Sequence, residues 1–449
     1  MAASAQTYTE LLSFDGNSAA GPKTALVQGA DGNLYGTTYY GGTGTCFDSA
    51  GIGCGVIFRV TRRHAFEVLY NFQSNGPTHP VYGLALGFDG NFYGIAGNSI
   101  FKATPAGDFS VVYTFTGGTG GYGVYGALIQ GVDGNFYGAT YYGGTPSQFC
   151  PGGCGTVFKM TPAGVVTTIY SFCPENYCSD GENPWGTLVQ GANGDLYGTA
   201  ENGGLYKRGT VFRVSPNGKF TLLYTFQGNF SQPYPGGMIL GTDGNFYGTT
   251  ESFAYQVTPL GVFTDVSDLV DGNNPNLMIQ GTDGNLYITT QEGGQYVYYG
   301  VILEMPTNGK ASVIHDFAGY PDDGAGPWGS LTQATDGKFY GDTFNGGEAN
   351  CNYTNNSPGC GTIFSLDMGL PPFVTFLRGA GGPGRRFGIL GQGFTGATSV
   401  SLNGTPVDFK VKADTFIAAT VPAGATTGYV TVTTSGGKLK SNVPFRVLK

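Results

Sequence analysis

The sequence is poor in charged residues, histidine and tryptophan, and it lacks long apolar runs. Asp, Glu, Lys and Arg make up only 11% of the 449 residues, and there are 3 histidines and 2 tryptophans. No stretch approaches the roughly 18 consecutive apolar residues of a membrane helix, so we expect no membrane span. With 40% hydrophobic residues the chain is also unlike a disordered protein.

Basic residues are fewer than acidic ones, and the formal net charge is -9. The excess of acid lies before residue 370, whereas residues 370–449 are basic. Nucleic-acid binding needs clustered cations, so we expect no nucleic-acid partner. The chain also lacks a nucleophile elbow and a phosphate loop, and we expect no metal centre and no cofactor. Only the acidic loops 180–182 and 322–324 leave structural calcium open, although they lack spaced oxygen ligands.

Glycine is abundant, with 80 residues, but it does not recur at every third position. A collagen-like chain is therefore excluded. Tyrosine and phenylalanine are also frequent, with 29 and 32 residues. Frequent glycine at turns together with aromatic residues is typical of an all-β protein with many short strands.

A phrase built around an Asp-Gly-Asn turn recurs along the chain. Its first copy spans residues 26–38, and Asp31 begins the turn. Later copies follow at spacings of about 40 to 60 residues, which brackets the ~40–50 residues of a four-stranded propeller blade. The equivalent turn residues are Asp89, Asp133, Asn193, Asp243, Asp283 and Asp336. These copies predict a seven-bladed β-propeller.

Each copy contains four short β-runs, A to D, except the last, which has no fourth run before residue 370. A run with the strand D pattern stands instead at residues 8–14, ahead of the first copy. Pairing of this run with the last blade would close the ring and remove an open sheet edge. We therefore predict N-terminal strand closure.

The eight cysteines form four close pairs in the sequence. A zinc site needs four converging ligands, and these pairs are separated along the chain without histidine beside them. We predict local disulfides, which imply a secreted or periplasmic protein. The small residues of Met1–Gln6 indicate a trimmed export signal. The predicted disulfides are Cys46–Cys54, Cys150–Cys154, Cys173–Cys178 and Cys351–Cys360.

The phrase Asp-Gly-Asn-Leu-Tyr-Gly-Thr-Thr, followed by Gly-Gly and Gly-Thr-Val-Phe, resembles the GloVer (Gloeobacter/Verrucomicrobium) tandem repeat of bacterial exported proteins. The resemblance covers roughly residues 7–368 and implies export, but no common activity. Residues 371–449 resemble an IPT/TIG domain, which has an immunoglobulin-like β-sandwich fold, through Gly391–Phe394, Ala397–Thr405 and Ala419–Gly424. We expect a propeller at residues 1–369, a sandwich at 370–449, and a monomer.

Aromatic residues precede strand A in four copies, at Tyr82, Tyr125, Trp185 and Trp328. Strand A lines the channel of a propeller, so these side chains should surround its upper mouth. Flat apolar faces with a polar handle suit stacking on sugars. Tyr40 and Tyr142, just after strand B, are expected on the same rim. The alternative is that the aromatic residues wedge between blades.

Three glutamates, Glu201, Glu251 and Glu292, also follow strand B. A pair of them could serve as acid and base in glycoside hydrolysis, if their carboxyl groups lie about 5–10 Å apart. His79 with Tyr82 could instead act in a β-eliminating polysaccharide lyase. The sequence leaves open whether the protein is an enzyme.

Three hypotheses follow from these patterns. The first is an extracellular protein that binds a glycan or another envelope ligand at the upper face of the propeller. The second is a carbohydrate-active enzyme, a lyase or a hydrolase, with its site in the same funnel. The third is a structural component of the cell surface or matrix.

Overall fold

The computed structural model describes residues 6–46, 53–174, 177–227, 233–269, 272–349, 351 and 358–448, with the side chains of 233–236 left out. The export-signal remnant expected at the N-terminus lies, except for Gln6, outside these residues. The described residues form β-strands, turns and one short 3-10 helix, η1 (Gly118–Gly120). None of their helices is long and apolar enough to cross a membrane. The fold is all-β, as predicted.

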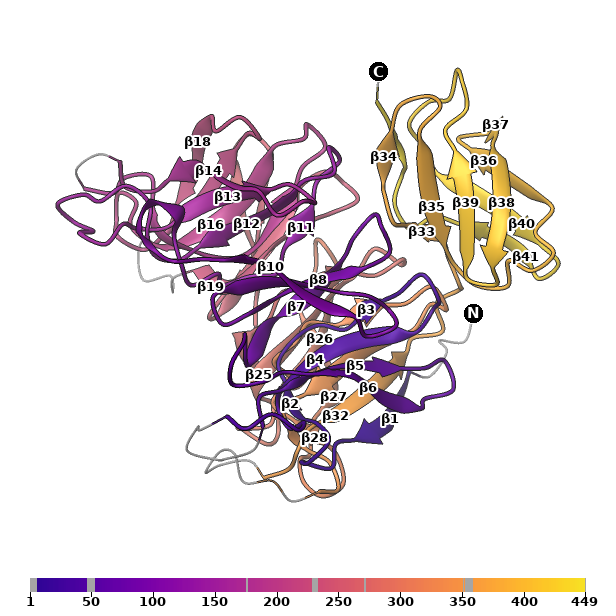
Figure 1. The fold of residues 1–449 in the computed structure, drawn as a ribbon, viewed down its shortest axis with the longest axis horizontal. Coiled ribbons are helices and arrows are strands. Elements are labelled where there is room, and N and C mark those ends of the chain that lie inside the picture. Colours follow the sequence, from indigo (N-terminus) through magenta and orange to yellow (C-terminus); the bar gives the residue numbers. More distant parts are fainter. Residues whose placement is uncertain are drawn as a thin grey trace.

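Each copy of the repeat corresponds to an antiparallel sheet of four or five strands, and the sheet of the last copy includes β1. We number the units 1 to 7 in the order of their turn residues, from Asp31 to Asp336. Units 4 and 5 are joined in one larger sheet, because β15 pairs with β19 at Thr187 and Gly237. Figure 1 shows these sheets in sequence from indigo to orange.

The strands of units 1 to 3 are β2 (Ala20–Pro22), β3 (Val27–Gln28), β4 (Leu34–Tyr40), β5 (Val56–Val60) and β6 (Phe66–Asn71); β7 (Pro80–Leu86), β8 (Phe92–Ala96), β9 (Ser99–Ala103) and β10 (Phe109–Thr114); β11 (Ile129–Gln130), β12 (Phe136–Thr140), β13 (Thr156–Met160) and β14 (Val166–Ser171). Those of units 4 and 5 are β15 (Glu182–Gln190), β16 (Leu196–Asn202), β17 (Thr210–Val214) and β18 (Phe220–Thr225); β19 (Pro233–Leu240), β20 (Phe246–Thr250), β21 (Phe253–Val257) and β22 (Phe263–Asp268). Those of units 6 and 7 are β23 (Gly272–Pro275), β24 (Ile279–Gln280), β25 (Leu286–Gly293), β26 (Val301–Met305) and β27 (Ser312–Asp316); β28 (Gly324–Ala325), β29 (Thr332–Gln333), β30 (Phe339–Thr343), β31 (Asn345–Gly346) and β32 (Thr362–Asp367).

A glutamine at the end of strand A ties neighbouring units together. Its side-chain oxygen accepts a hydrogen bond from the turn of the preceding unit, and its nitrogen donates to its own turn. In unit 3, for example, Gln130 accepts from the amide of Phe88 at 2.7 Å and donates to the carbonyl of Gly134. The other accepted bonds are Val132 to Gln190, Thr242 to Gln280, Thr282 to Gln333 and Thr335 to Gln28. The last of these joins unit 7 to unit 1.

Strand β1 (Thr7–Ser13) pairs antiparallel with β32 of unit 7, from Thr7 opposite Asp367 to Ser13 opposite Thr362. This confirms the predicted partner of the N-terminal strand, and Figure 1 shows the two strands side by side. Two aromatic side chains fix it. Tyr8 stacks on His315 at 3.8 Å and donates a hydrogen bond to Asp323. Phe14 is 2% exposed in the core shared by units 1 and 7.

The Asp of the repeated turn contributes through its side chain. Within the Asp-Gly-Asn turns only the glycine has a positive φ, such as 80° at Gly32. The Asp31 carboxylate instead accepts bonds from the amide of Asn33 and from the hydroxyl of Tyr35, at 3.1 and 2.8 Å. The Asp therefore anchors the buried strand B tyrosine as well as the turn.

All four predicted disulfides are present, and the described residues contain no free cysteine. The reason for rejecting a four-cysteine cluster was nevertheless wrong. The B–C loop of unit 3 meets the loop before unit 4, and the four sulfurs of Cys150, Cys154, Cys173 and Cys178 lie within 4.8 Å of one another. They are bonded as two adjacent disulfides.

The strands after residue 370 form two four-stranded sheets around one core, drawn in yellow in Figure 1. One sheet has the order β33-β35-β39-β38 and the other β37-β36-β40-β41, with β34 pairing β42 beside them. Their bounds are β33 (Thr375–Phe376), β34 (Ala380–Gly381), β35 (Arg386–Leu390), β36 (Ser399–Leu402), β37 (Thr405–Pro406), β38 (Asp408–Ala413), β39 (Phe416–Thr420), β40 (Val430–Thr434), β41 (Gly437–Lys440) and β42 (Arg446–Val447).

These C-terminal strands contact the A–B turns of the repeat units. Arg446 donates to the carbonyl of Gly191, and Thr415 donates to that of Ala30. Arg378 donates to the carbonyl of Val132 and lies 4.8 Å from the ring centre of Phe88. Part of the positive charge of the C-terminal residues is thus used inside the molecule.

Candidate functional site

A cavity of about 470 Å³ lies at the start of the A strands, on the side of the units opposite the A–B turns. Its wall is made by the same three successive repeat positions in six of the units, together with Gln291. In unit 5 the equivalent positions are 235–237, and the first two fall in 233–236, whose side chains lie outside the described residues. The lining residues are 23–25, 81–83, 125–127, 185–187, 275–277 and 328–330.

The four predicted aromatic residues line this cavity. Tyr82, Tyr125 and Trp185 form a continuous row, with ring centres 6.0 and 5.2 Å apart. Trp328 belongs to unit 7 and is 40% exposed. Burial raises the pKa of Tyr82 and Tyr125 above the ordinary value, so both hydroxyls remain neutral hydrogen-bond donors. The cavity therefore has flat apolar surfaces with polar edges.

Lys23 is the equivalent residue of unit 1, and the sequence interpretation missed it. It stands eight positions before the turn Asp, as Tyr125, Trp185 and Trp328 do in their units. Its Nζ lies 4.1 Å from the ring centre of Tyr39, 4.3 Å from that of Trp328 and 4.8 Å from that of Phe344. Comparing repeat positions would have placed it on the rim.

An amide pair supplies the main polar groups of the opposite wall. Asn276 donates hydrogen bonds to Thr289 and to the carbonyl of Pro327, at 3.0 and 2.7 Å. Gln291 donates to the side-chain oxygen of Asn276 at 3.2 Å. The pair is therefore held in place before any ligand binds.

Tyr40 and Tyr142 do not line the cavity, although both were expected on its rim. Tyr40 packs edge-on against Tyr39, and Tyr142 stacks on Tyr122 with ring centres 5.0 Å apart. Tyr40 lies within β4 rather than after it, because β4 is lengthened by pairing with β2. These residues support the rim from outside.

The carboxylates proposed for catalysis also lie outside the cavity. Glu201 accepts a hydrogen bond from Tyr141 at 2.8 Å, and Tyr141 packs edge-on against Trp185. Glu251 and Glu292 are exposed. Among the described residues that line the cavity there is no acid and no histidine.

His79 lies near the rim but not in the cavity wall. Its ring centre is 4.6 Å from that of Tyr39, and its backbone amide donates to the carbonyl of Cys54. His79 thus supports the aromatic residues around Lys23, whereas Tyr82 faces the cavity.

Asp342, in β30, occupies a strand B position at which several units have threonine. It is the one ionisable side chain at this position. It is 1% exposed, and neither carboxylate oxygen has a hydrogen-bond partner among the described residues. Burial raises its pKa well above the ordinary value. The side chain is therefore held as a neutral acid over a wide range of pH.

The acidic loops considered for calcium are occupied by protein donors. Asp323 accepts from Tyr8 and lies 3.2 Å from the Nε2 of His315. Asp180 accepts from the hydroxyl of Tyr170 and the amide of Cys173.

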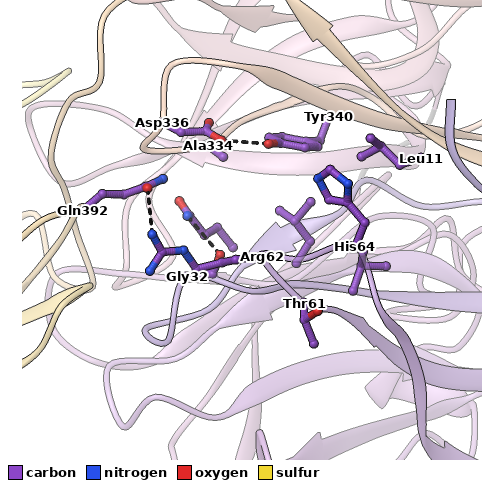
Figure 2. Close-up of a pocket in the computed structure, with 12 residues that line it drawn as sticks. Leu11, Gly32, Thr61, Arg62, His64, Ala334, Asp336, Tyr340 and Gln392 are labelled. Carbon is purple, nitrogen blue, oxygen red and sulfur yellow. Dashed lines mark hydrogen bonds between the residues drawn. The ribbon is translucent and has the colours of Figure 1, made fainter. Parts of the chain in front are cut away.

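A second, smaller cavity of about 160 Å³ lies where units 1 and 7 meet the C-terminal residues (Figure 2). Arg62 donates to Gln392 at 3.2 Å and forms an ion pair with Asp414. His64, at the turn between β5 and β6, also lines this cavity. The cavity is a gap in the contact between the two parts of the chain.

Comparisons with known proteins support the repeat and the fold. A family model described as the Gloeobacter/Verrucomicrobia repeat matches residues 50–258, which confirms the resemblance over that stretch. No curated protein sequence matches the chain. The match leaves the C-terminal residues unassigned.

Three solved structures have similar folds at low sequence identity. A streptogramin B lyase has a TM-score of 0.56 at 17% identity, covering 80% of this chain and 97% of its own. A fungal alcohol oxidase of the AA5 family, in complex with copper, has 0.56 at 13%, covering 99% of both chains. The extracellular domain of a two-component system from B. thetaiotaomicron has 0.56 at 12%, covering 96% of this chain and 51% of its own. These similarities show a β-propeller-like fold alone.

Proposed function

We propose that the seven repeat units form a closed seven-bladed propeller and that residues 370–449 form an immunoglobulin-like domain. The bond between Thr335 and Gln28 supports closure, because it repeats between units 7 and 1 the contact made by successive units. The shared core of the two C-terminal sheets supports the second assignment. The four disulfides support a secreted or periplasmic location.

The protein binds a glycan in the cavity at the start of the A strands. One observation carries this proposal: equivalent positions of six units meet around one cavity, and four of them present Tyr82, Tyr125, Trp185 and Trp328. Sugar rings stack on such faces, and the Asn276–Gln291 pair can bond sugar hydroxyls. The cavity wall has no acid and no histidine among its described residues, which favours binding over hydrolysis or elimination.

The test is a glycan array on the intact protein, followed by affinity measurements with the variants Trp185→Ala and Trp328→Ala. Truncation of an anchor residue should weaken the binding free energy by about 2 kcal/mol, which is a loss of affinity of roughly 30-fold. Tyr206→Ala is the control, because Tyr206 is 50% exposed outside the cavity. The melting temperature of each variant is measured in parallel.

The alternative roles predict other results. If the aromatic residues only wedge between units, both variants lose thermal stability and keep their affinity. Depolymerisation of a bound polysaccharide would make the protein an enzyme. Failure of the intact protein to bind any glycan would favour a structural role and refute the proposal.

A further inference from the structure

The charge next to the aromatic rim indicates which kind of sugar the cavity takes. Lys23 lines the cavity, and its ammonium group lies over the rings of Tyr39 and Trp328. No carboxylate lies within ion-pair distance of it among the described residues, and it makes no hydrogen bond within them. The lysine is thus held by aromatic faces, and its N–H donors have no acceptor among the described residues.

Lys23 differs from the other cations of the repeat units in its burial. Some of these cations pair with carboxylates, as Lys102 does with Asp89 at 2.8 Å and Lys338 with Asp367 at 3.0 Å, and an unpaired one such as Lys310 is exposed, whereas Lys23 is half-buried. Burial of an ammonium group without a partner is unfavourable, and it lowers the pKa of Lys23 to about 8. An arriving anion would restore the missing interaction.

The position of Lys23 indicates where that anion would lie. Its Nζ lies 4.1 to 4.8 Å from the ring centres of Tyr39, Trp328 and Phe344. Lys23 and Trp328 also line the cavity, together with Tyr82 and Tyr125. A ligand in the cavity that stacks on an aromatic ring can therefore present a charged group to Lys23.

We propose that the cavity is specific for an acidic sugar, a uronate whose carboxylate pairs with Lys23 while its ring stacks on the neighbouring aromatic residues. The proposal rests on the glycan-binding function above and deepens it. The stacking faces supply affinity for any sugar. Lys23 selects the acidic one, because no carboxylate of the described residues neutralises its charge.

The experiment uses the intact protein and oligosaccharides of galacturonate, mannuronate and glucuronate, each beside its carboxyl-reduced neutral counterpart. These pairs share a backbone and differ in charge. We expect at least one acidic oligosaccharide to bind tenfold or more tightly than its neutral form at pH 6.5. Lys23→Met should abolish the preference and Lys23→Arg should keep it, because arginine retains the charge.

Lys310→Met is the matched control, since Lys310 is an exposed lysine at the turn between β26 and β27. In the unaltered protein the preference should also fall as the pH rises above about 8, because Lys23 loses its proton there. The Lys23→Arg variant should keep its preference to higher pH. This titration tests the proposal without relying on the folding of a variant.

The possible failures are distinct. Equal binding of acidic and neutral forms, or a preference that survives in Lys23→Met, refutes the selectivity for uronates. If that binding still depends on Trp185, glycan binding itself stands. Absence of binding by every oligosaccharide of the panel and the array overturns both proposals.

Discussion

Asp342 is an exception to the repeat, and its replacement tests how an unpaired buried carboxyl group affects the free energy of unfolding. Its carboxyl group is fully buried without a partner among the described residues, at a repeat position that is threonine in several units. In two of those units the hydroxyl donates to a backbone carbonyl, from Thr199 to Trp185 and from Thr289 to Gly329 of the next unit, whereas that of Thr249 has no partner among the described residues. The substitution Asp342→Thr therefore replaces an unpaired acid with a neutral side chain that several units bury at this position.

The expected gain depends on pH, and its sign follows from the raised pKa of Asp342. An ordinary aspartic acid titrates near 4 in the unfolded chain. Below that pH the carboxyl group is protonated in both the folded and the unfolded state. It then destabilises the folded state only as an unpaired polar group, by about 1–3 kcal/mol. Above it the unfolded chain releases the proton and the folded one does not. The cost then grows by about 1.4 kcal/mol for each pH unit until the folded pKa is reached.

Urea unfolding at pH 4.5, 6 and 8 measures this difference between the variant and the native protein. Both tryptophans lie in the repeat units, so their fluorescence follows this part of the chain. We expect Asp342→Thr to be more stable, with a difference that increases toward pH 8. Asp268→Thr, at an exposed position of β22, should show no such increase. A difference that does not vary with pH, or a less stable variant at pH 8, would show that the carboxylate has a partner in solution and refute the reasoning.

Two further predictions concern the closure of the units and the cysteines. Phe14→Ala should lower the free energy of unfolding by about 3–5 kcal/mol, because Phe14 is buried between units 1 and 7, whereas Thr9→Ala on the exposed face of β1 should change it little. Equal urea midpoints for the two variants would contradict a stabilising role of β1. Peptide mapping without reduction should recover the four local disulfides, and a peptide linking Cys154 to Cys178, whose sulfurs lie 3.8 Å apart, would contradict this pairing.

Much of the architecture could be predicted because the same sequence pattern recurs in every copy of the repeat. The turn residues and the strand patterns around them specify each sheet, and the missing last strand specifies the partner of β1. The aromatic residues could be placed on one rim for the same reason, since equivalent repeat positions occupy equivalent places. Lys23 also occupies the equivalent repeat position. A search for aromatic residues missed it, whereas a comparison of repeat positions would have found it.

Contacts between loops could not be predicted, because sequence spacing contains no distance across a turn. The convergence of Cys154 and Cys178 results from a B–C loop meeting the loop before the next unit. The places of Glu201 and Glu292 likewise depend on how far strand B extends, and β16 and β25 both continue through these residues. Residue type alone therefore suggested catalytic groups that the structure keeps outside the cavity.

Two of the turns that the C-terminal residues contact lack the glutamine bond between units. Units 2 and 5 have Leu86 and Leu240 in place of the glutamine, so the turns of units 1 and 4 are not tied to the unit that follows. It is at these two turns that Thr415 and Arg446 donate their hydrogen bonds. The C-terminal residues thus supply a hydrogen bond at both turns that lack a glutamine bond. Loss of these residues would remove bonds from two distant repeat units at once, so we expect the unfolding of the two parts of the chain to be coupled.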